Sequence, residues 1–142
     1  MNKIKSIDGT LIAVDKSGSG PALLLVHGGG GSDHRRWDIA GLRSKLAEHF
    51  TIYRYDRRGR GKSGDAVEYK LEREFEDVAA IVETINESVI LLGHSHGALI
   101  ALEAALKISN CRVGGASRPQ PLQRTARALF RHTAPHKIIH YK

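Results

Sequence analysis

The chain has 142 residues, of which 41% are hydrophobic and 26% are charged. This length suits one domain with a single moderate core, and the composition is typical of soluble globular proteins. No stretch approaches the roughly 18 uninterrupted apolar residues that a membrane span needs, and Asp8 lies where an export signal would be apolar. We therefore expect a cytoplasmic protein, and its single cysteine, Cys111, fits a reducing compartment.

The net charge of +7 is not spread evenly over the chain. Residues 1–111 contain 15 Lys and Arg and 15 Asp and Glu, so the whole positive excess lies in residues 112–142. A change in composition near Asn110 and Cys111 thus separates a neutral part from a basic part. We predict that residues 1–110 form a domain and that residues 111–142 are a basic tail outside the fold.

The neutral part alternates short strand patterns with helical patterns. Residues 3–7 and 10–14, on either side of Asp8-Gly9, predict a hairpin. The other elements expected in chain order are a buried strand at 22–26, a helix at 37–46, a strand at 50–55, an amphipathic helix at 71–85, a strand at 88–92 and an apolar helix at 98–108. This order predicts an α/β fold, in which helices cover both faces of a mostly parallel sheet.

The most specific motif is Gly93-His94-Ser95-His96-Gly97, which matches G-x-S-x-G between an expected strand and an expected helix. A serine on so tight a turn has an unfavourable backbone angle and an exposed hydroxyl, while the flanking glycines avoid side-chain clashes. The start of the next helix favours developing negative charge. The motif predicts a reactive serine; the alternative is a glycine-rich turn whose serine only caps the helix.

A run of four glycines, Gly28 to Gly31, follows His27 at the end of the strand expected at 22–26. Successive glycines allow a backbone N–H to approach a substrate atom closely, as an oxyanion hole requires. On these residues alone, a flexible loop or a phosphate cradle without catalysis is an equal alternative.

Residues 56–64, DRRGRGKSG, partly match two nucleotide-binding motifs. A P-loop is excluded because its first glycine would fall at Asp56. The three glycines satisfy the dinucleotide fingerprint, but that fingerprint must open a helix, and the helical pattern begins only at Leu71. We therefore predict no cofactor.

Three blocks in this order resemble the N-terminal part of the α/β-hydrolase fold: His27-Gly28, Asp56-x-Arg58-Gly59-x-Gly61-x-Ser63 and Gly93-x-Ser95-x-Gly97. The resemblance covers about residues 3–110, and the segment 33–37 is similar to that of esterase-like and haloperoxidase-like serine hydrolases. It implies a hydrolase of small-molecule ester or amide bonds that works through an acyl-enzyme. By this resemblance Ser95 is the nucleophile, the N–H groups of Gly29 and His96 form the oxyanion hole, and residues 56–63 have a structural role.

The chain departs from the family order, in which an acid and then a histidine follow the serine. After Ser95 the only carboxylate is Glu103, and His94 and His96 adjoin the serine on a turn, where neighbouring side chains diverge. We therefore expect a C-terminally truncated fold that lacks the family acid and histidine, so that activity of this chain is an open question. A sheet edge left uncovered in this way would favour self-association.

The basic tail leaves two interpretations open. Its composition shows no periodic pattern of residues and fits an out-of-frame or rearranged segment that follows residue 110. Alternatively it is a functional arm, which would make the chain a noncatalytic module that binds nucleic acid or an acidic partner. We expect a small-molecule substrate rather than nucleic acid or a membrane. His132, His136 and His140 could share a helical face, but such histidines are more often solvated, so we predict no metal site.

Overall fold

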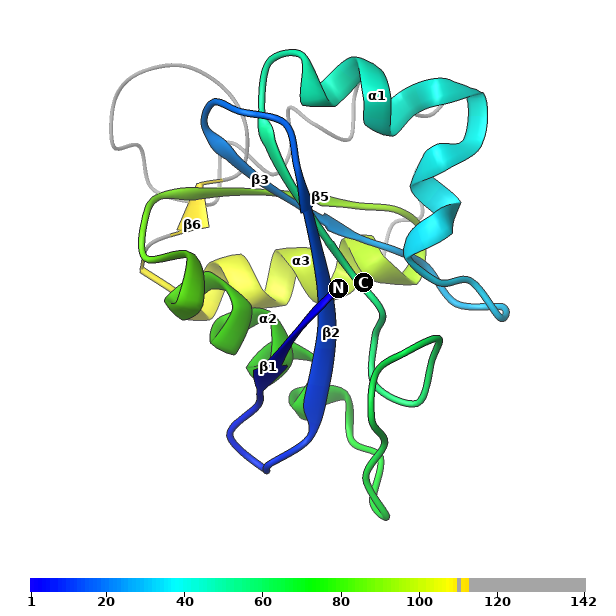
Figure 1. Cartoon of the computed structure of the whole chain (residues 1–142). Coiled ribbons are helices and arrows are strands. Elements are labelled where there is room, and N and C mark those ends of the chain that lie inside the picture. Colours follow the sequence, from blue (N-terminus) through cyan, green and yellow to red (C-terminus); the bar gives the residue numbers. More distant parts are fainter. Residues whose placement is uncertain (110, 113–142) are drawn as a thin grey trace, which may run out of the picture.

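A computed structural model describes residues 1–109, 111 and 112, and a six-stranded sheet lies at its centre (Figure 1). The order of strands across the sheet is β1-β2-β4-β3-β5-β6. The strands are β1 (Asn2–Lys5), β2 (Leu11–Ser17), β3 (Ala22–Val26), β4 (Thr51–Tyr55), β5 (Val89–Gly93) and β6 (Cys111–Arg112).

Strand β3 is central and pairs in parallel with β4 on one side and β5 on the other. The β1–β2 hairpin joins the sheet through an antiparallel pairing of β2 with β4. In its turn the N–H of Ser6 donates to the carbonyl of Thr10 at 2.8 Å. The predicted hairpin and the mostly parallel sheet are both confirmed. Because β3, β4 and β5 run in the same direction, the loops after them meet at one edge of the sheet.

Helices cover both faces of the sheet (Figure 1). They are η1 (a 3-10 helix, His34–Gly41), α1 (Leu42–Ala47), α2 (Leu71–Ile85) and α3 (His96–Lys107). The alternating side chains of β3 explain the two layers, because Leu24 packs with α2 and α3 while Leu23 and Leu25 pack with Trp37 of η1. None of the described helices is long and apolar enough to cross a membrane.

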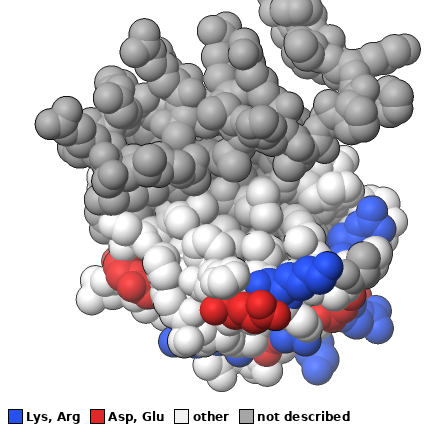
Figure 2. Space-filling view, turned by 90° about the horizontal axis from the view of Figure 1, so that it is seen from above, with Lys and Arg blue, Asp and Glu red and all other residues white. Residues whose placement is uncertain are grey.

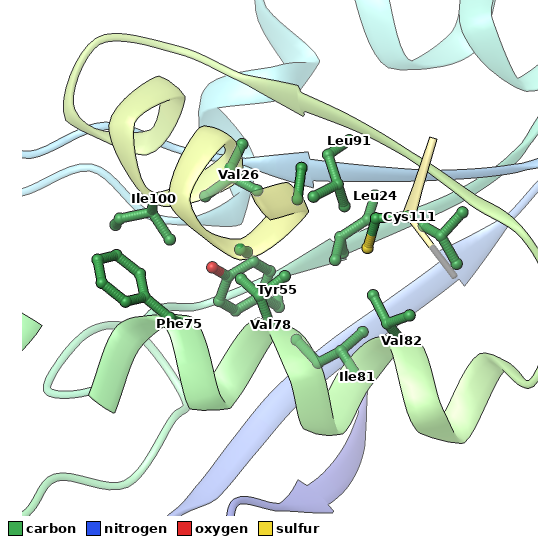
Figure 3. Close-up of a cluster of buried hydrophobic side chains, with 14 of the residues drawn as sticks. Leu24, Val26, Tyr55, Phe75, Val78, Ile81, Val82, Leu91, Ile100 and Cys111 are labelled. Carbon is green, nitrogen blue, oxygen red and sulfur yellow. The ribbon is translucent and has the colours of Figure 1, made fainter. Parts of the chain in front are cut away.

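The larger core lies between the sheet and helix α2 (Figure 3). Apolar residues of α2 recur every three or four positions and form one buried face, as expected for an amphipathic helix. They pack against Tyr55 of β4, Leu91 of β5 and Ile100 of α3. The buried apolar residues of α2 are Phe75, Val78, Ile81 and Val82.

The segment between β3 and β4 differs from the single helix expected at 37–46. It contains η1 and then α1, and Gly41, the last residue of η1, has the left-handed conformation at a φ of 69°. That conformation is easy for glycine and ends a regular helix. The carboxylate of Asp33 caps the start of η1 by accepting a hydrogen bond from the N–H of Arg35 at 2.8 Å.

The last two described residues form a strand that is not among the elements expected from the sequence. Residues Cys111 and Arg112 form β6, which pairs in parallel with Val89 and Ile90 of β5. The Cys111 side chain is buried in the larger core, which is why this short segment pairs although its composition gives no strand signal. The rest of the predicted tail, with His132, His136 and His140, lies outside the described residues.

Acidic and basic side chains lie next to one another on the described part of the face that Figure 2 shows. Among the pairs in the described residues, the Asp38 carboxylate accepts hydrogen bonds from Arg43 at 2.6 Å and from Arg54 at 2.7 Å. These pairs agree with the balanced charge of residues 1–111.

We expect Ile81→Ala to lower the free energy of unfolding by about 2–5 kcal/mol, because it leaves a cavity between α2 and the sheet. Ile39→Ala is the matched control: its side chain is 56% exposed, so the change should stay within about 0.5 kcal/mol. Urea unfolding followed by circular dichroism measures both values. Equal losses for the two variants would contradict the placement of Ile81 in the core.

Candidate active site

Ser95 lies on the turn between β5 and α3, at the edge of the sheet where the parallel strands end. Its backbone has a φ of 55° and a ψ of −126°, a combination that costs a residue with a side chain about 1–3 kcal/mol. The residue is exposed and immediately precedes the first turn of α3. The strained turn and exposed serine predicted from G-x-S-x-G are therefore present.

The two glycines of the motif allow α3 to start directly against the sheet. A Cβ on Gly97 would overlap the carbonyl oxygens of Val26 and His27 at the end of β3. A Cβ on Gly93 would overlap the backbone of Gly97 and Ala98. Both positions require glycine for close packing, which fixes the turn against β3.

The glycine loop after β3 touches this turn. A Cβ on Gly28 would lie 3.2 Å from the Cβ of Ser95 and 3.0 Å from the carbonyl oxygen of His94. The next residue, Gly29, faces open space, since a Cβ there would meet nothing within 4 Å. In the described part of the chain, the N–H groups of Gly29 and His96 donate to no other protein group. The structure thus brings the loop that contains Gly29 against the turn that contains Ser95 and His96.

His27 is buried beneath the glycine loop and is held as the neutral imidazole. Its Nε2 accepts a hydrogen bond from the N–H of Arg57 at 3.1 Å, so the proton lies on Nδ1, which donates to the carbonyl of Gly28 at 2.9 Å. Burial lowers the pKa of His27, and the positive charge of Arg57 adds to this effect, whereas the hydrogen bond to Gly28 opposes it.

Two consecutive arginines after β4 form buried ion pairs with α2. Arg57 donates to Glu74 from Nε at 2.9 Å and from Nη2 at 2.5 Å, and its Nη1 donates to the carbonyl of Gly28 at 3.0 Å. Arg58 donates to Asp77 from Nε at 2.8 Å and from Nη2 at 2.7 Å. Sequence reasoning missed both pairs.

The carboxylate of Asp56 fixes the two loops to each other. It accepts hydrogen bonds from the N–H of His34 at 2.9 Å, from the Nδ1 of His34 at 2.7 Å and from the N–H of Lys62 at 2.8 Å. Burial alone would raise the pKa of Asp56, but these donors outweigh it and hold the pKa below its usual value.

Asp33, His34 and Asp56 also lie close enough to share a cation. We assign none, because N–H donors already occupy the Asp56 oxygens and Arg35 occupies those of Asp33.

The rest of the loop after β4 contacts the hairpin. The N–H of Ala13 donates to Ser63 Oγ at 2.8 Å, and Ser63 Oγ donates to the carbonyl of Asp56. The N–H of Gly64 donates to the carbonyl of Leu11 at 2.7 Å. These contacts fit the structural role expected for residues 56–63.

Within the described residues, no histidine ring or carboxylate contacts the hydroxyl of Ser95 through a hydrogen bond. Glu103 follows Ser95 by eight positions, which is roughly 12 Å along α3. The ring of His94 packs edge-on against Trp37, with centroids 6.5 Å apart. The site as described therefore has a candidate nucleophile and two free N–H donors, and no general base is in place.

A separate polar hollow of about 530 Å³ lies beside the loop after β4. Ser95, Gly29 and His96 do not line it. Its lining residues are Arg58, Gly59, Arg60, Asp65, Ala66, Val67, Tyr69 and Glu74.

A sequence model described as "Alpha/beta hydrolase family" matches residues 23–140. The uncharacterized hydrolase YraK of Bacillus subtilis is 34% identical over 110 residues, which are 75% of this chain and 40% of that protein. A crystal structure of an alpha/beta hydrolase from Sphaerobacter thermophilus is 45% identical, with a TM-score of 0.69 over 75% of this chain and 40% of that one. The esterase EaEST from Exiguobacterium antarcticum is 29% identical, with a TM-score of 0.69 over 78% of this chain and 42% of that one. The chain thus spans about 40% of the length of these relatives.

We expect the chain to lose stability as the pH falls below about 6.5, the usual pKa of histidine. There the unfolded chain binds a proton at His27, while the folded chain, whose His27 pKa is lowered, does not, so acid favours unfolding. Urea midpoints measured between pH 5 and pH 8 should fall less steeply with acid in His27→Gln than in the wild type. The surface variant His49→Gln is the matched control, and equal slopes for wild type and His27→Gln would contradict the prediction.

Proposed function

The chain belongs to the alpha/beta hydrolase family, and from this premise we propose that its Ser95 is the nucleophile for hydrolysis of small-molecule esters or amides. The main support is one contact: the loop with Gly28 and Gly29 packs directly against the strained turn of Ser95. The esterase among the structural relatives also favours an ester substrate.

In the proposed reaction, Ser95 Oγ attacks the carbonyl carbon of the substrate and loses its proton to a base. The carbonyl oxygen becomes an oxyanion, which accepts hydrogen bonds from the N–H groups of Gly29 and His96. Such donors lower the barrier by about 2.7–4 kcal/mol each when they are preorganised. Collapse of the intermediate expels the alcohol or amine and leaves an acyl-serine, which water then hydrolyses.

The proton from Ser95 needs a base, and the base needs an orienting carboxylate. The described residues supply neither beside the serine. The proposal places the base outside them and assigns no orienting carboxylate, because all Asp and Glu of the chain lie in residues 1–111. What the described residues do supply is the nucleophile and the oxyanion donors. Oxyanion stabilisation and binding alone can leave roughly 10³–10⁴-fold catalysis over water when a triad is incomplete.

We propose a cytoplasmic location for the chain. Cys111 is a free, buried cysteine, and burial raises the pKa of its thiol to about 11, which makes the thiol unreactive. A free cysteine of this kind is compatible with the reducing cytoplasm. We also propose a folded domain that is close to residues 1–110, followed by the basic tail.

The second candidate function is a noncatalytic module that binds an acidic partner. The excess positive charge of residues 112–142 favours it.

A fluorophosphonate that forms a covalent bond with reactive serines should label the full chain at Ser95, as read by mass spectrometry of the digested protein. Ser95→Ala should remove the label, because no hydroxyl remains at the turn. Ser109→Ala, which changes another exposed serine, is the matched control and should be labelled like the wild type. A wild-type chain that takes no label, or equal labelling of Ser95→Ala, would refute the proposal and favour the binding module.

A further inference from the structure

We propose that the buried pair of Arg57 and Glu74 sets the direction of the Gly29 N–H and so positions one of the two oxyanion donors. This inference rests on the proposed function, because it assigns a purpose to a donor of that site. Arg57 and Glu74 would be positioning residues, since they act through the glycine loop and do not touch the substrate.

The peptide bond between Gly28 and Gly29 is held by the interior. Its carbonyl oxygen accepts two hydrogen bonds from buried side chains, one from Arg57 Nη1 at 3.0 Å and one from His27 Nδ1 at 2.9 Å. In a planar trans peptide the C=O and the following N–H point in opposite directions. Because the Gly28 carbonyl points into the interior, the Gly29 N–H points away from Arg57 and His27, and it donates to no other group of the described residues.

Without these two hydrogen bonds, the glycine loop would be free to change its backbone conformation. Glycine adopts many backbone conformations, so a peptide between two glycines turns over more easily than one between larger residues. Turned over, this peptide would present its carbonyl oxygen to the site, and the N–H donors of Arg57 and His27 would lose their acceptor in the interior. Buried donors without partners are unfavourable, so the two side chains disfavour the turned-over state.

Arg57 is itself held in place by helix α2. Glu74 binds its guanidinium through two parallel hydrogen bonds, and both side chains are at most 2% exposed. The hydroxyl of Tyr69 also donates to Glu74, at 3.1 Å. Glu74 lies on α2 next to Phe75, which is in the core, so the position of α2 determines the position of Arg57. The bidentate geometry leaves the guanidinium one orientation, with Nη1 toward Gly28.

The neighbouring pair of Arg58 and Asp77 does not contact the glycine loop, so the contact with Gly28 is particular to Arg57. It has the same bidentate geometry and the same burial, one residue further along the loop and one turn further along α2. Its remaining donor, Arg58 Nη1, contacts Asp8 in the hairpin turn at 2.8 Å and not the glycine loop. The two pairs therefore serve as test and control.

The experiment replaces each pair by apolar residues in the full 142-residue chain. Replacing both partners leaves no unpaired buried charge, and such replacements are often neutral for stability. We expect Arg57→Met with Glu74→Leu to slow fluorophosphonate labelling of Ser95 by about 100-fold, the cost of a misplaced donor. Arg58→Met with Asp77→Leu should be labelled at the wild-type rate. An unchanged rate in the folded Arg57/Glu74 variant would overturn the inference and leave the proposed function intact.

A second measurement does not depend on labelling. In NMR spectra of the isotope-labelled chain, the carbonyl carbon of Gly28 should shift when Arg57 and Glu74 are replaced, and the residual dipolar coupling of the Gly29 N–H should change. Neither should change in the Arg58/Asp77 variant. If the wild type takes no label, the proposed function fails, and these signals alone decide whether Arg57 orients the peptide. Unchanged signals would overturn the inference.

Arg57→Lys gives the same test if the double variant does not fold. It retains a positive charge for Glu74, but a single ammonium lacks the planar set of donors that reaches Glu74 and Gly28 together. We expect slower labelling and a shifted Gly28 signal with this variant as well, and wild-type behaviour in both would overturn the inference.

Discussion

The fold depends on burying four charged side chains between α2 and the loop after β4. Arg57, Arg58, Glu74 and Asp77 are each at most 3% exposed, and removing an ion from water costs several kcal/mol even after relaxation. The cost is offset because each carboxylate meets a guanidinium through two parallel hydrogen bonds. Burial still raises the pKa of Asp77, although Arg58 acts to lower it. Because both pairs join α2 to the loop after β4, they constrain how the helix packs on the sheet.

The same pairs connect the parts of the sheet edge that the core does not reach. Arg58 contacts Asp8 in the hairpin turn, and this partner holds the pKa of Asp8 well below its usual range. Arg57 contacts Gly28 in the loop after β3. A core of aliphatic side chains is nondirectional, whereas these hydrogen bonds have fixed geometry. The loops at the candidate site are therefore positioned by polar contacts, and the strands beneath them by apolar packing.

Local sequence patterns predicted most helices and strands and the turn of Ser95, because the residues that determine each of them are close together in the sequence. Helix α2 occupies the residues expected from its periodicity, and G-x-S-x-G identified a backbone conformation that the structure shows. Two misses have local causes. Gly41 divides the helix expected at 37–46, and β6 is too short to have a periodicity of its own.

The buried ion pairs were missed because their partners are 17 and 19 residues apart and no local pattern joins them. The sequence of α2 did, however, contain one indication of buried pairing. Glu74 and Asp77 lie at the helical spacing of the apolar stripe of α2, on the face that packs against the sheet. A carboxylate on such a face needs a cationic partner, and the two arginines of DRRG supply it in the structure. Two acids in an apolar stripe are thus a usable prediction of buried pairing.

In the proposed chemistry, the contacts that position the oxyanion donors are separate from the group that acts as the general base. The groups that position Ser95, Gly29 and His96 come from β3, the loop after β4, α2 and α3, all within the described residues. A general base would act on a different atom, the proton of the Ser95 hydroxyl, and it need not contact the glycine loop. Stabilisation of an oxyanion depends on donors that are already oriented before the reaction. The described residues can therefore preorganise the proposed oxyanion site whatever supplies the base, because the contacts that orient its donors do not involve that base.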